Sequence, residues 1–485
     1  MSFLLASVVL CSATASSLFS DGMMLQRDRP VPVWGTASPG ERVDASFGGK
    51  SASATADAKG NWCVTLPAFP ASDKGRDLKV GSRTIKDVIV GDVYLAGGQS
   101  NMQFPVCGQS SRQHDAKGNA LAQIAADDAL RFASARRMYS QAPTNDVELI
   151  WRKSNRAGLE RQVYEGNFEE GSISAVAWYF ARYVREAAKV PVGFVDVSRG
   201  GALIEPFMPP AEVKRAGELR LNGWEHQAPG VMWNAMIAPM ARFPFKGVLW
   251  YQGESNKNDT NGVYLAKLRA LMGGWRREFG NPSLPFYYVQ LAPCSTGHLS
   301  VQLQQAEYEK EDPNAAMVVV SDIGNLRNIH PRDKDTVGLR LALRALKKDY
   351  GFTGIQDASP EVCKATCDAS GKVSLEFANA KWMYVLNEDM SLAADFELMD
   401  PTGAWRAARI ANFKESWRWW EKRSVKNGEV EGNVIELSAD GVAQPRAVRY
   451  LFNKPWQGSV FNEASLPLGP FEMSVAGKAA GGGSR

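Results

Sequence analysis

The chain has 485 residues, of which 45% are hydrophobic and 22% charged, a balance typical of a folded globular protein and not of a disordered one. Its length predicts two or three domains. The formal net charge is only +4 and no Lys/Arg-rich run marks a nucleic-acid surface, so nucleic acid is not an expected partner.

The N-terminus is apolar from Phe3 to Leu10 and continues in small residues to an A-x-A-like site at Ala13 to Ala15. This pattern resembles a short secretory signal, which we expect over residues 1–16 and which would make the protein secreted or periplasmic. A basic stretch at its start is missing, and a first buried strand is the other interpretation. No other stretch has the apolar length of a membrane span, so no span is expected.

The sequence contains six cysteines, and Cys11 would leave with the signal. Cys363 and Cys367 lie four positions apart. They either close a small disulfide loop in an oxidising compartment or stay as two buried thiols. A pair with this spacing and no nearby histidine is weak evidence for a metal, and we expect no metal site.

Short alternating segments between Gly, Pro and Asp turns predict a β-sandwich-like domain over residues 17–90. From 91 to 350, apolar runs alternate with amphipathic helices, which predicts an α/β domain whose parallel sheet carries helices on both faces. The expected buried strands are 92–98, 192–198, 247–253, 285–291 and 316–322. The clearest expected helices are 176–189, 263–279 and 336–350.

Residues 104–173 fit this alternation poorly because they are rich in Gln, Asn, Ser and Asp, so we expect an insertion over the sheet edge. Residues 351–475 return to β-like segments and predict a second β domain, and 476–485 read as a flexible tail. Trp417, Trp419 and Trp420 form an aromatic cluster in this part, suited either to a core or to stacking on a sugar.

Ligands of open parallel sheets bind beyond the carboxyl ends of the strands. Gly97-Gly98-Gln99-Ser100 follows the first expected strand, Arg199-Gly200-Gly201 the second, Gln252-Gly253-Glu254-Ser255-Asn256 the third, and the fifth leads to His330. Each is by itself better explained as a tight turn or as a surface or helix-capping histidine. Together, at one sheet edge, they predict a serine hydrolase with a nucleophile, a base and oxyanion donors. Met102 breaks the strict G-x-S-x-G pattern, which disfavours an α/β-hydrolase.

Four blocks, in this order, resemble the sialate O-acetylesterase family within the SGNH/GDSL hydrolases. They are GQSNMQFP around Ser100, GGALIEPFMP from Gly200, WNAMIAPM with KGVLWYQGESN between Trp233 and Asn256, and IHPRDKDTVGLRLA from Ile329. The flanking segments LFSDGMMLQRDRPVPVWG and RAVRYLFNKPW are similar to the β domains of that family. The resemblance therefore covers nearly the whole chain and implies a flavodoxin-like fold with a five-stranded parallel sheet between two β domains.

The resemblance also implies roles for individual residues. Ser100 matches the nucleophile, His330 the general base, and Gly201 the glycine whose N–H faces the oxyanion. Gln252 is the candidate side-chain donor, with Asn256 as the second choice. The implied substrate is an O-acetylated sugar or glycan, and the implied reaction requires no metal or organic cofactor.

Many SGNH enzymes carry an aspartate two or three residues before the histidine, but this chain has Arg327 and Asn328 there. Asp322, Asp333 or a backbone carbonyl could orient the imidazole, or serine and histidine could act as a dyad.

The substrate of such an esterase is open at this point. If it is sialic acid, Arg199 is a candidate partner for the carboxylate, with a surface ion pair as the other reading. Acetylated xylan is the alternative substrate, and a non-catalytic carbohydrate-binding relative is the alternative function. A lipase or thioesterase is the least favoured reading, because these loops are polar.

Overall fold

The computed structural model describes residues 13–106, 126–159, 173–215, 227–324, 327–386, 395–416, 427–452 and 458–477. Residues 1–12 of the expected signal segment 1–16 lie outside the described residues, as do Cys107, the cluster from Trp417 to Trp420 and the tail after 477. The end of that segment is described, and Thr14–Ala15 form a strand that pairs with Gly35 and Thr36. The chain forms two compact units, residues 1–250 with 266–286 and residues 251–265 with 287–485. The division into domains at 90 and 350 stays a prediction.

The N-terminal part of the first unit is built from antiparallel strands, as its turn-rich sequence predicted. β3 pairs with β6, and β4 pairs with both β5 and β7. Buried and exposed residues alternate along β4 and β6, the pattern of strands with one face on a core. The strands are β1 (Thr14–Ala15), β2 (Met24–Gln26), β3 (Val31–Thr36), β4 (Arg42–Phe47), β5 (Lys50–Thr55), β6 (Asn61–Leu66) and β7 (Ser72–Val80).

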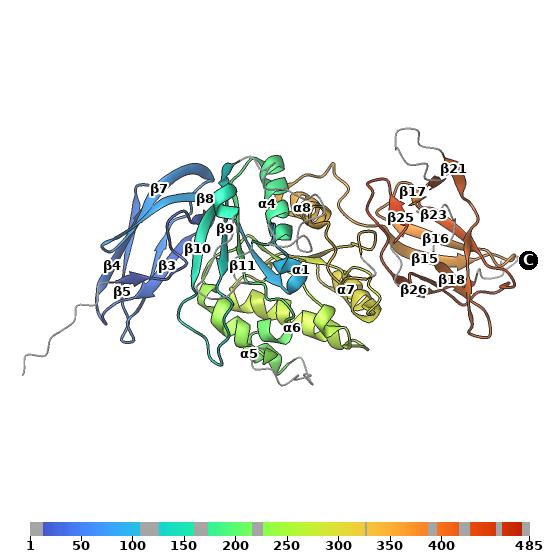
Figure 1. The fold of residues 1–485 in the computed structure, drawn as a ribbon, viewed down its shortest axis with the longest axis horizontal. Coiled ribbons are helices and arrows are strands. Elements are labelled where there is room, and N and C mark those ends of the chain that lie inside the picture. Colours follow the sequence, from blue (N-terminus) through green and yellow to red (C-terminus); the bar gives the residue numbers. More distant parts are fainter. Residues whose placement is uncertain are drawn as a thin grey trace, which may run out of the picture. The chain divides into compact units, whose positions relative to one another are not determined.

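A large mixed sheet has the strand order β10-β9-β11-β8-β12-β13-β14 (Figure 1). All five expected buried runs are strands in it. In β8, every residue from Val88 to Gly98 is buried, which is typical of a parallel sheet covered on both faces. Its strands are β8 (Arg83–Gly98), β9 (Asp127–Ala135), β10 (Leu149–Ser154), β11 (Val192–Asp196), β12 (Gly247–Tyr251), β13 (Phe286–Val289) and β14 (Ala315–Val318).

The sheet has more strands than the five expected. β9 pairs with β11 in parallel and β10 pairs with β9 in antiparallel, so part of the region assigned to an insertion is sheet. The sequence of β9 hides this because it contains Arg131. That side chain is buried and donates to the carboxylate of Asp87 at 3.0 Å and to the carbonyl of Gly22 at 3.0 Å. A paired, buried arginine thus gives the strand a polar appearance.

Helices cover both faces of the sheet. Tyr94 of β8 contacts Phe180 of α4 edge to face, with ring centroids 4.7 Å apart. A Cβ placed on Gly97 of the same strand would lie 3.4 Å from Trp275 of α6. Because side chains of a strand alternate between faces, α4 and α6 lie on opposite sides (Figure 1). The helices of this unit, with shorter turns, are α1 (Ser100–Gln103), α3 (Arg156–Leu159), α4 (Ala175–Ala188), η1 (Glu205–Phe207), α5 (Pro210–Val213), η3 (Trp233–Ile237), η4 (Ala238–Met240) and α6 (Val263–Glu278).

In the second unit, β13 and β14 are joined by a hydrogen bond from Gln290 N to Val318 O at 2.9 Å. Two long helices pack on β14. Gly351, with φ of 76°, ends the second of them in the left-handed conformation that favours glycine. The helical elements of this unit are η5 (Glu254–Asn256), α7 (Leu299–Glu311) and α8 (Lys334–Tyr350). Within the described ranges, no helix is both long and apolar enough to cross a membrane.

The C-terminal part of the second unit consists of three small sheets around an apolar core, in line with the expected second β domain. Val373, Leu375 and Phe377 of one strand face this core together with Leu398 and Ile435. The strands are β15 (Glu361–Cys367), β16 (Val373–Ala378), β17 (Met383–Leu386), β18 (Phe396–Met399), β19 (Trp405–Ala407), β20 (Arg409–Ile410), β21 (Lys414–Ser416), β22 (Asn427–Val430), β23 (Val434–Ser438), β24 (Ala447–Tyr450), β25 (Val460–Asn462), β26 (Phe471–Ser474) and β27 (Ala476–Gly477).

Cys363 and Cys367 are separate thiols on β15, the first exposed and the second buried. Four positions along a strand correspond to about 13 Å, well beyond the reach of a disulfide. A register shift next to Cys363 turns its side chain outward, whereas Cys367 stays on the core face. The structure therefore has two free thiols and no disulfide loop, but the expectation that both are buried is wrong for Cys363.

Candidate active site

Ser100 stands directly after the strand β8, as its sequence predicted. The strand ends on Gly98, whose φ of 135° few other residues adopt, and Gln99 then opens the short helix α1 at Ser100. Gly97 allows the strand to pack closely here, since a Cβ on it would lie 3.0 Å from the ring of Trp250. The glycine pair therefore allows the strand to end abruptly and places Ser100 just beyond the end of the sheet.

The glycine segment after β11 lies beside Ser100. A Cβ placed on Gly200 would be 3.7 Å from the Cβ of Ser100 and 2.9 Å from Oε1 of Gln103. The N–H of Gly200 donates to that same Oε1 at 2.5 Å, and the N–H of Arg199 donates to the carbonyl of Gly98 at 2.9 Å. Two of the sequence blocks thus meet in the first unit, held together by the Gln103 side chain.

Gly201, the predicted backbone donor, has φ of 71°, a conformation that favours glycine. Gln227 holds this loop from the other side, because its Nε2 donates to the carbonyl of Gly201 at 3.0 Å and its Oε1 accepts the N–H of Leu203 at 2.9 Å. Arg199 is half-buried at the start of the loop. Its predicted contact with a substrate carboxylate stays a prediction.

A buried ion pair fixes the base of the same loop. Asp196, at the end of β11, accepts from Arg137 Nη2 at 3.1 Å and from Ser198 Oγ at 2.6 Å. Arg137 also donates to the carbonyl of Ser198 at 3.0 Å. Burial raises the pKa of Asp196, and the Arg137 guanidinium opposes that rise. These contacts set the direction in which the chain leaves the sheet toward Arg199.

The far end of the loop is anchored by a second buried pair. Lys267 Nζ of α6 lies 2.6 Å from Glu205 Oε1, and both side chains are almost completely buried. Trp275 Nε1 of the same helix donates to the carbonyl of Phe207 at 2.9 Å. The segment between the two glycines and Phe207 is therefore tied to a helix, which limits the freedom of the predicted oxyanion donor.

Gln252 and Asn256, the predicted side-chain donors, lie together at the end of β12 in the second unit. Nε2 of Gln252 donates to Oδ1 of Asn256 at 2.7 Å, and Nδ2 of Asn256 donates to Asp259 at 2.8 Å. The hydroxyl of Tyr264 donates to Oε1 of Gln252 at 2.9 Å. Because the carboxylate of Asp259 only accepts, Oδ1 of Asn256 must face Gln252, and this gives the N–H₂ end of Gln252 a defined direction.

The imidazole of His330 is oriented by the residue two positions before it. The backbone N–H of His330 donates to Oδ1 of Asn328 at 2.9 Å, and Nδ1 of its ring lies 3.2 Å from the same oxygen. A backbone N–H only donates, so the atom of Asn328 at this point is the oxygen. An amide oxygen cannot donate, so Nδ1 carries the proton of the neutral ring. Nε2 then holds the lone pair that a general base needs.

The two carboxylates considered for this role are engaged elsewhere. Asp322 accepts from both terminal nitrogens of Arg340 at 2.7 Å. Asp333 caps α8 and accepts from the N–H of Thr336 at 3.0 Å and from its hydroxyl at 2.7 Å. Asn328, an amide two residues before the histidine, is the group that contacts Nδ1 in the described part of the chain.

Burial lowers the pKa of His330, and the ammonium of Lys334 lowers it further. Lys334 is buried at the start of α8, with Nζ 5.3 Å from the ring centroid of Tyr251 at the end of β12. This cation–π contact connects the helix that follows His330 with the strand that precedes Gln252. The neutral, basic form of His330 is favoured by its surroundings.

The structure thus brings together some of the predicted residues in each unit. Ser100 lies beside the Gly200–Gly201 segment in the first unit, and Gln252 contacts Asn256 in the second. The approach of Ser100 to His330 stays a prediction, as do the catalytic roles. Sequence reasoning missed Gln103, Tyr264 and Asn328, which hold the predicted residues in place. Only Asn328 carried a local signal, its position two residues before the histidine.

The comparisons with known proteins agree with this arrangement. Residues 90–347, more than half of the chain, match the family model described as carbohydrate esterase, sialic acid-specific acetylesterase. The chain is 28% identical to the sialate O-acetylesterase of Rattus norvegicus over 95% of this chain and 94% of that protein. It is also 28% identical to that of Homo sapiens, over 71% of this chain and 72% of the relative.

A solved structure is similar along nearly the whole chain. The crystal structure of a carbohydrate acetylesterase from Xanthomonas citri aligns with a TM-score of 0.81 and 32% sequence identity, over 95% of this chain and 99% of that one. This confirms the family that the four sequence blocks predicted. The protein is a carboxylic ester hydrolase and belongs to the carbohydrate esterase family of sialic acid-specific acetylesterases.

Proposed function

We propose that the protein removes O-acetyl groups from sugars through an acetyl-Ser100 intermediate, with His330 as the general base. The observation that carries this proposal is the hydrogen bonding of His330. Asn328 holds Nδ1 in its protonated form, so Nε2 is the ring nitrogen that would act as the base. The lowered pKa of His330 supports the same role, because a base must be unprotonated to act.

In the proposed reaction, Nε2 of His330 takes the proton of the Ser100 hydroxyl while Oγ attacks the acetyl carbonyl carbon. The negative charge moves to the carbonyl oxygen, which accepts from the N–H groups of Ser100 and Gly201 and from Nε2 of Gln252. A single donor of this kind lowers the barrier by about 3 kcal/mol. The C–O bond to the sugar then breaks, and the sugar oxygen takes the proton from His330.

Water completes the cycle. His330 removes a proton from water as it attacks the acetyl-enzyme, and then returns a proton to Oγ of Ser100 as acetate leaves. Each step needs only the serine, the imidazole and the oxyanion donors. Asn328 keeps the protonated Nδ1 fixed in both halves of the cycle and is a positioning residue in this scheme.

The first substrate proposed is O-acetylated sialic acid, in keeping with the names of the curated relatives. Its carboxylate would pair with Arg199, which begins the glycine loop beside Ser100. Acetylated xylan is the alternative, and the name of the solved relative, a carbohydrate acetylesterase, leaves room for it. Because the N-terminal sequence is apolar from Phe3 to Leu10, we also propose that the protein acts outside the cytoplasm.

The test is a substrate panel with two variants. Acetate release is measured from O-acetyl-N-acetylneuraminic acid and from acetylated xylo-oligosaccharides, with wild-type protein, Ser100→Ala and His330→Ala. We expect turnover by the wild type and a loss of at least about a thousandfold in each variant. Faster turnover of the xylo-oligosaccharides would select the alternative substrate. No hydrolysis of any acetyl ester by the wild type would reject the esterase and favour a sugar-binding relative.

A further inference from the structure

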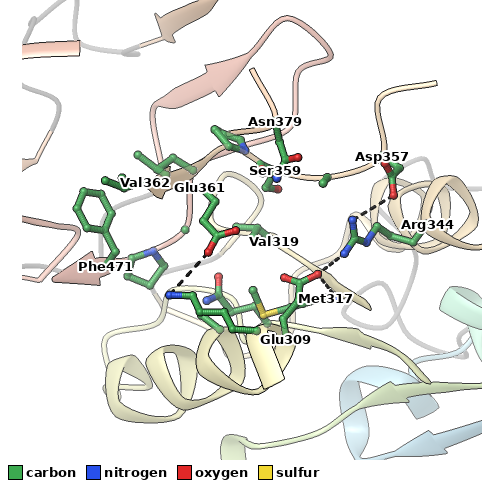
Figure 2. A pocket seen from close by; sticks show the side chains of 18 of the residues that line it. Glu309, Met317, Val319, Arg344, Asp357, Ser359, Glu361, Val362, Asn379 and Phe471 are labelled. Atoms are coloured by element: carbon green, nitrogen blue, oxygen red, sulfur yellow. Dashed lines mark hydrogen bonds and ion pairs between the residues drawn. The ribbon is translucent and has the colours of Figure 1, made fainter. Parts of the chain in front are cut away.

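The second unit contains a cavity of about 570 Å³ that involves none of the proposed catalytic residues (Figure 2). It lies between α7, β14 and α8 on one side and the segments 357–362 and 468–473 on the other. Ser321 ties the two sides together, because its Oγ donates to the carbonyl of Leu468 at 2.9 Å and its carbonyl accepts from Gly458 at 2.8 Å. The volume is within the range of about 300–1,000 Å³ typical of small-molecule sites.

The walls of this cavity differ in character from one end to the other. Figure 2 shows Val362 and Phe471 at one end, and Arg344 with Asp357 at the other. Arg344 donates to Asp357 at 3.1 Å and also to Glu309. The lining has four acidic and four basic side chains, so it does not select for a charged ligand: Glu309, Asp357, Glu361 and Glu472 against Lys310, Arg344, Lys347 and Lys348.

Three oxygens that line the cavity lack a donor within the described part of the chain. Gln290 is 1% exposed, and its Nε2 donates to the carbonyl of Gln302 at 3.0 Å, but its Oε1 accepts no hydrogen bond. Oε1 of Glu309 accepts from Arg344 and from the N–H of Met317, whereas its Oε2 accepts none. Oδ1 of Asn379 likewise has no donor, although its Nδ2 donates to Ser359.

Water can reach these acceptors, since Asn379 is exposed and the Glu309 side chain is 30% exposed, so a ligand would exchange hydrogen bonds with water at them. Burial raises the pKa of the Glu309 carboxyl, and the Arg344 guanidinium opposes that rise. Gly469 keeps the space beside Oε1 of Gln290 open, because a Cβ at this position would lie 2.9 Å from that oxygen. A ligand with several hydrogen-bond donors and one apolar face would satisfy this lining.

We propose that this cavity is a non-catalytic carbohydrate-binding site that takes a neutral sugar residue of a glycan chain. A pyranose ring has hydroxyl groups that donate to the open oxygens of Gln290, Glu309 and Asn379. Its C–H face packs on the apolar end formed by Val362 and Phe471. The four acidic and four basic side chains of the lining give no preference for an anionic sugar. The site would hold a glycan without hydrolysing it, which goes beyond the proposed deacetylation.

The proposal is tested by isothermal titration of the full-length protein with xylohexaose and cellohexaose. Both probes are neutral and carry no acetyl ester, so the measurement does not depend on catalysis. We expect binding to the wild type with a Kd on the order of 1 mM. Glu309→Gln places a donor where the open oxygen faces the cavity, and Ala306→Trp fills part of its volume. Each variant is expected to bind at least about tenfold more weakly.

Glu307→Gln is the matched control, because Glu307 belongs to the same helix and its side chain is 55% exposed. It should bind like the wild type, and all three variants should hydrolyse p-nitrophenyl acetate at the wild-type rate if they are folded. Absence of binding to both neutral probes, or equal binding by the wild type and both cavity variants, overturns the proposal. The proposal is also overturned if N-acetylneuraminic acid, at the same concentration as xylohexaose, displaces bound xylohexaose from both the wild type and Glu307→Gln. Failure of the esterase proposal would appear separately, as sugar binding without acetate release.

Discussion

Oδ1 of Asn328 accepts the backbone N–H of His330 at 2.9 Å and lies 3.2 Å from Nδ1 of the same residue. The amide therefore fixes the tautomer of the imidazole without placing a negative charge beside it. A carboxylate at this point would do both, since it would also stabilise the imidazolium. This difference leads to a measurable expectation for the pH dependence of the enzyme.

Asn328→Asp should raise the pKa of His330, because the new carboxylate favours the protonated ring. The acid limb of kcat/KM should then move to higher pH by about one unit, and the plateau above it should persist. The measurement is the pH profile of p-nitrophenyl acetate hydrolysis. Asn328→Ala, which cannot hold Nδ1, should lower the plateau by about a hundredfold without moving the limb upward. An unchanged plateau in Asn328→Ala would show that the amide does not position the base.

Lys334 should keep the wild-type enzyme active below the usual pKa of histidine. A base works when it is unprotonated, and the pKa of His330 is lowered from 6.5 by burial and by the Lys334 ammonium. Activity should therefore fall only as the pH drops through this lowered value. Lys334→Met removes the positive charge and should shift the acid limb upward. Lys347→Met, in the last turn of the same helix, is the control and should leave the limb in place.

Tyr264→Phe should reduce kcat with little change in KM. Its hydroxyl donates to Oε1 of Gln252 at 2.9 Å and so directs the proposed oxyanion donor. We expect a loss of about tenfold, against about a hundredfold or more for Gln252→Ala. Tyr308→Phe removes a comparable buried hydroxyl, one that donates to Asp312 at 2.6 Å, and should affect stability alone. Equal kcat values for Tyr264→Phe and Tyr308→Phe would contradict the assignment of Gln252.

Gly97→Ala should destabilise the first unit. The added methyl group would lie 3.0 and 3.1 Å from ring atoms of the buried Trp250, so the strand or the indole must shift. Overpacking of this kind lowers the free energy of unfolding by about 1–3 kcal/mol. Gly354→Ala, with no atom within 4 Å of the added carbon, should stay within about 0.5–1 kcal/mol of the wild type. Chemical denaturation of both variants gives the comparison.

The strands of the central sheet were readable from the sequence where burial makes them continuously apolar. The five runs found in this way are β8, β11, β12, β13 and β14. β9 escaped because Arg131 is buried in its middle and paired with Asp87. An ion pair between residues far apart in the sequence cannot be predicted from the local hydrophobic pattern. The first and last β regions were recognisable as such, but their sheet pairings were not.

In the candidate site, too, some residues could be predicted from the sequence and others could not. Ser100, Gly201 and Gln252 follow strands of the sheet and His330 precedes α8, so all four could be proposed from their order along the chain. Gln103 and Tyr264 could not, because their contacts join elements that are distant in sequence. Asn328 was noticed only as a missing aspartate. That an amide could take over the hydrogen bond became visible once the backbone N–H of His330 identified its oxygen.

One strand, β8, begins against the N-terminal β part and ends at Gly98, two residues before Ser100. Its buried Asp92 is held by Gln26 Nε2 at 3.0 Å and by Arg27 Nε at 3.0 Å, and Gln26 Oε1 accepts the N–H of Val93 at 2.9 Å. A protein trimmed to start at residue 91 would leave that carboxylate without both donors. A shortened esterase should therefore retain the N-terminal segment that contains Gln26 and Arg27.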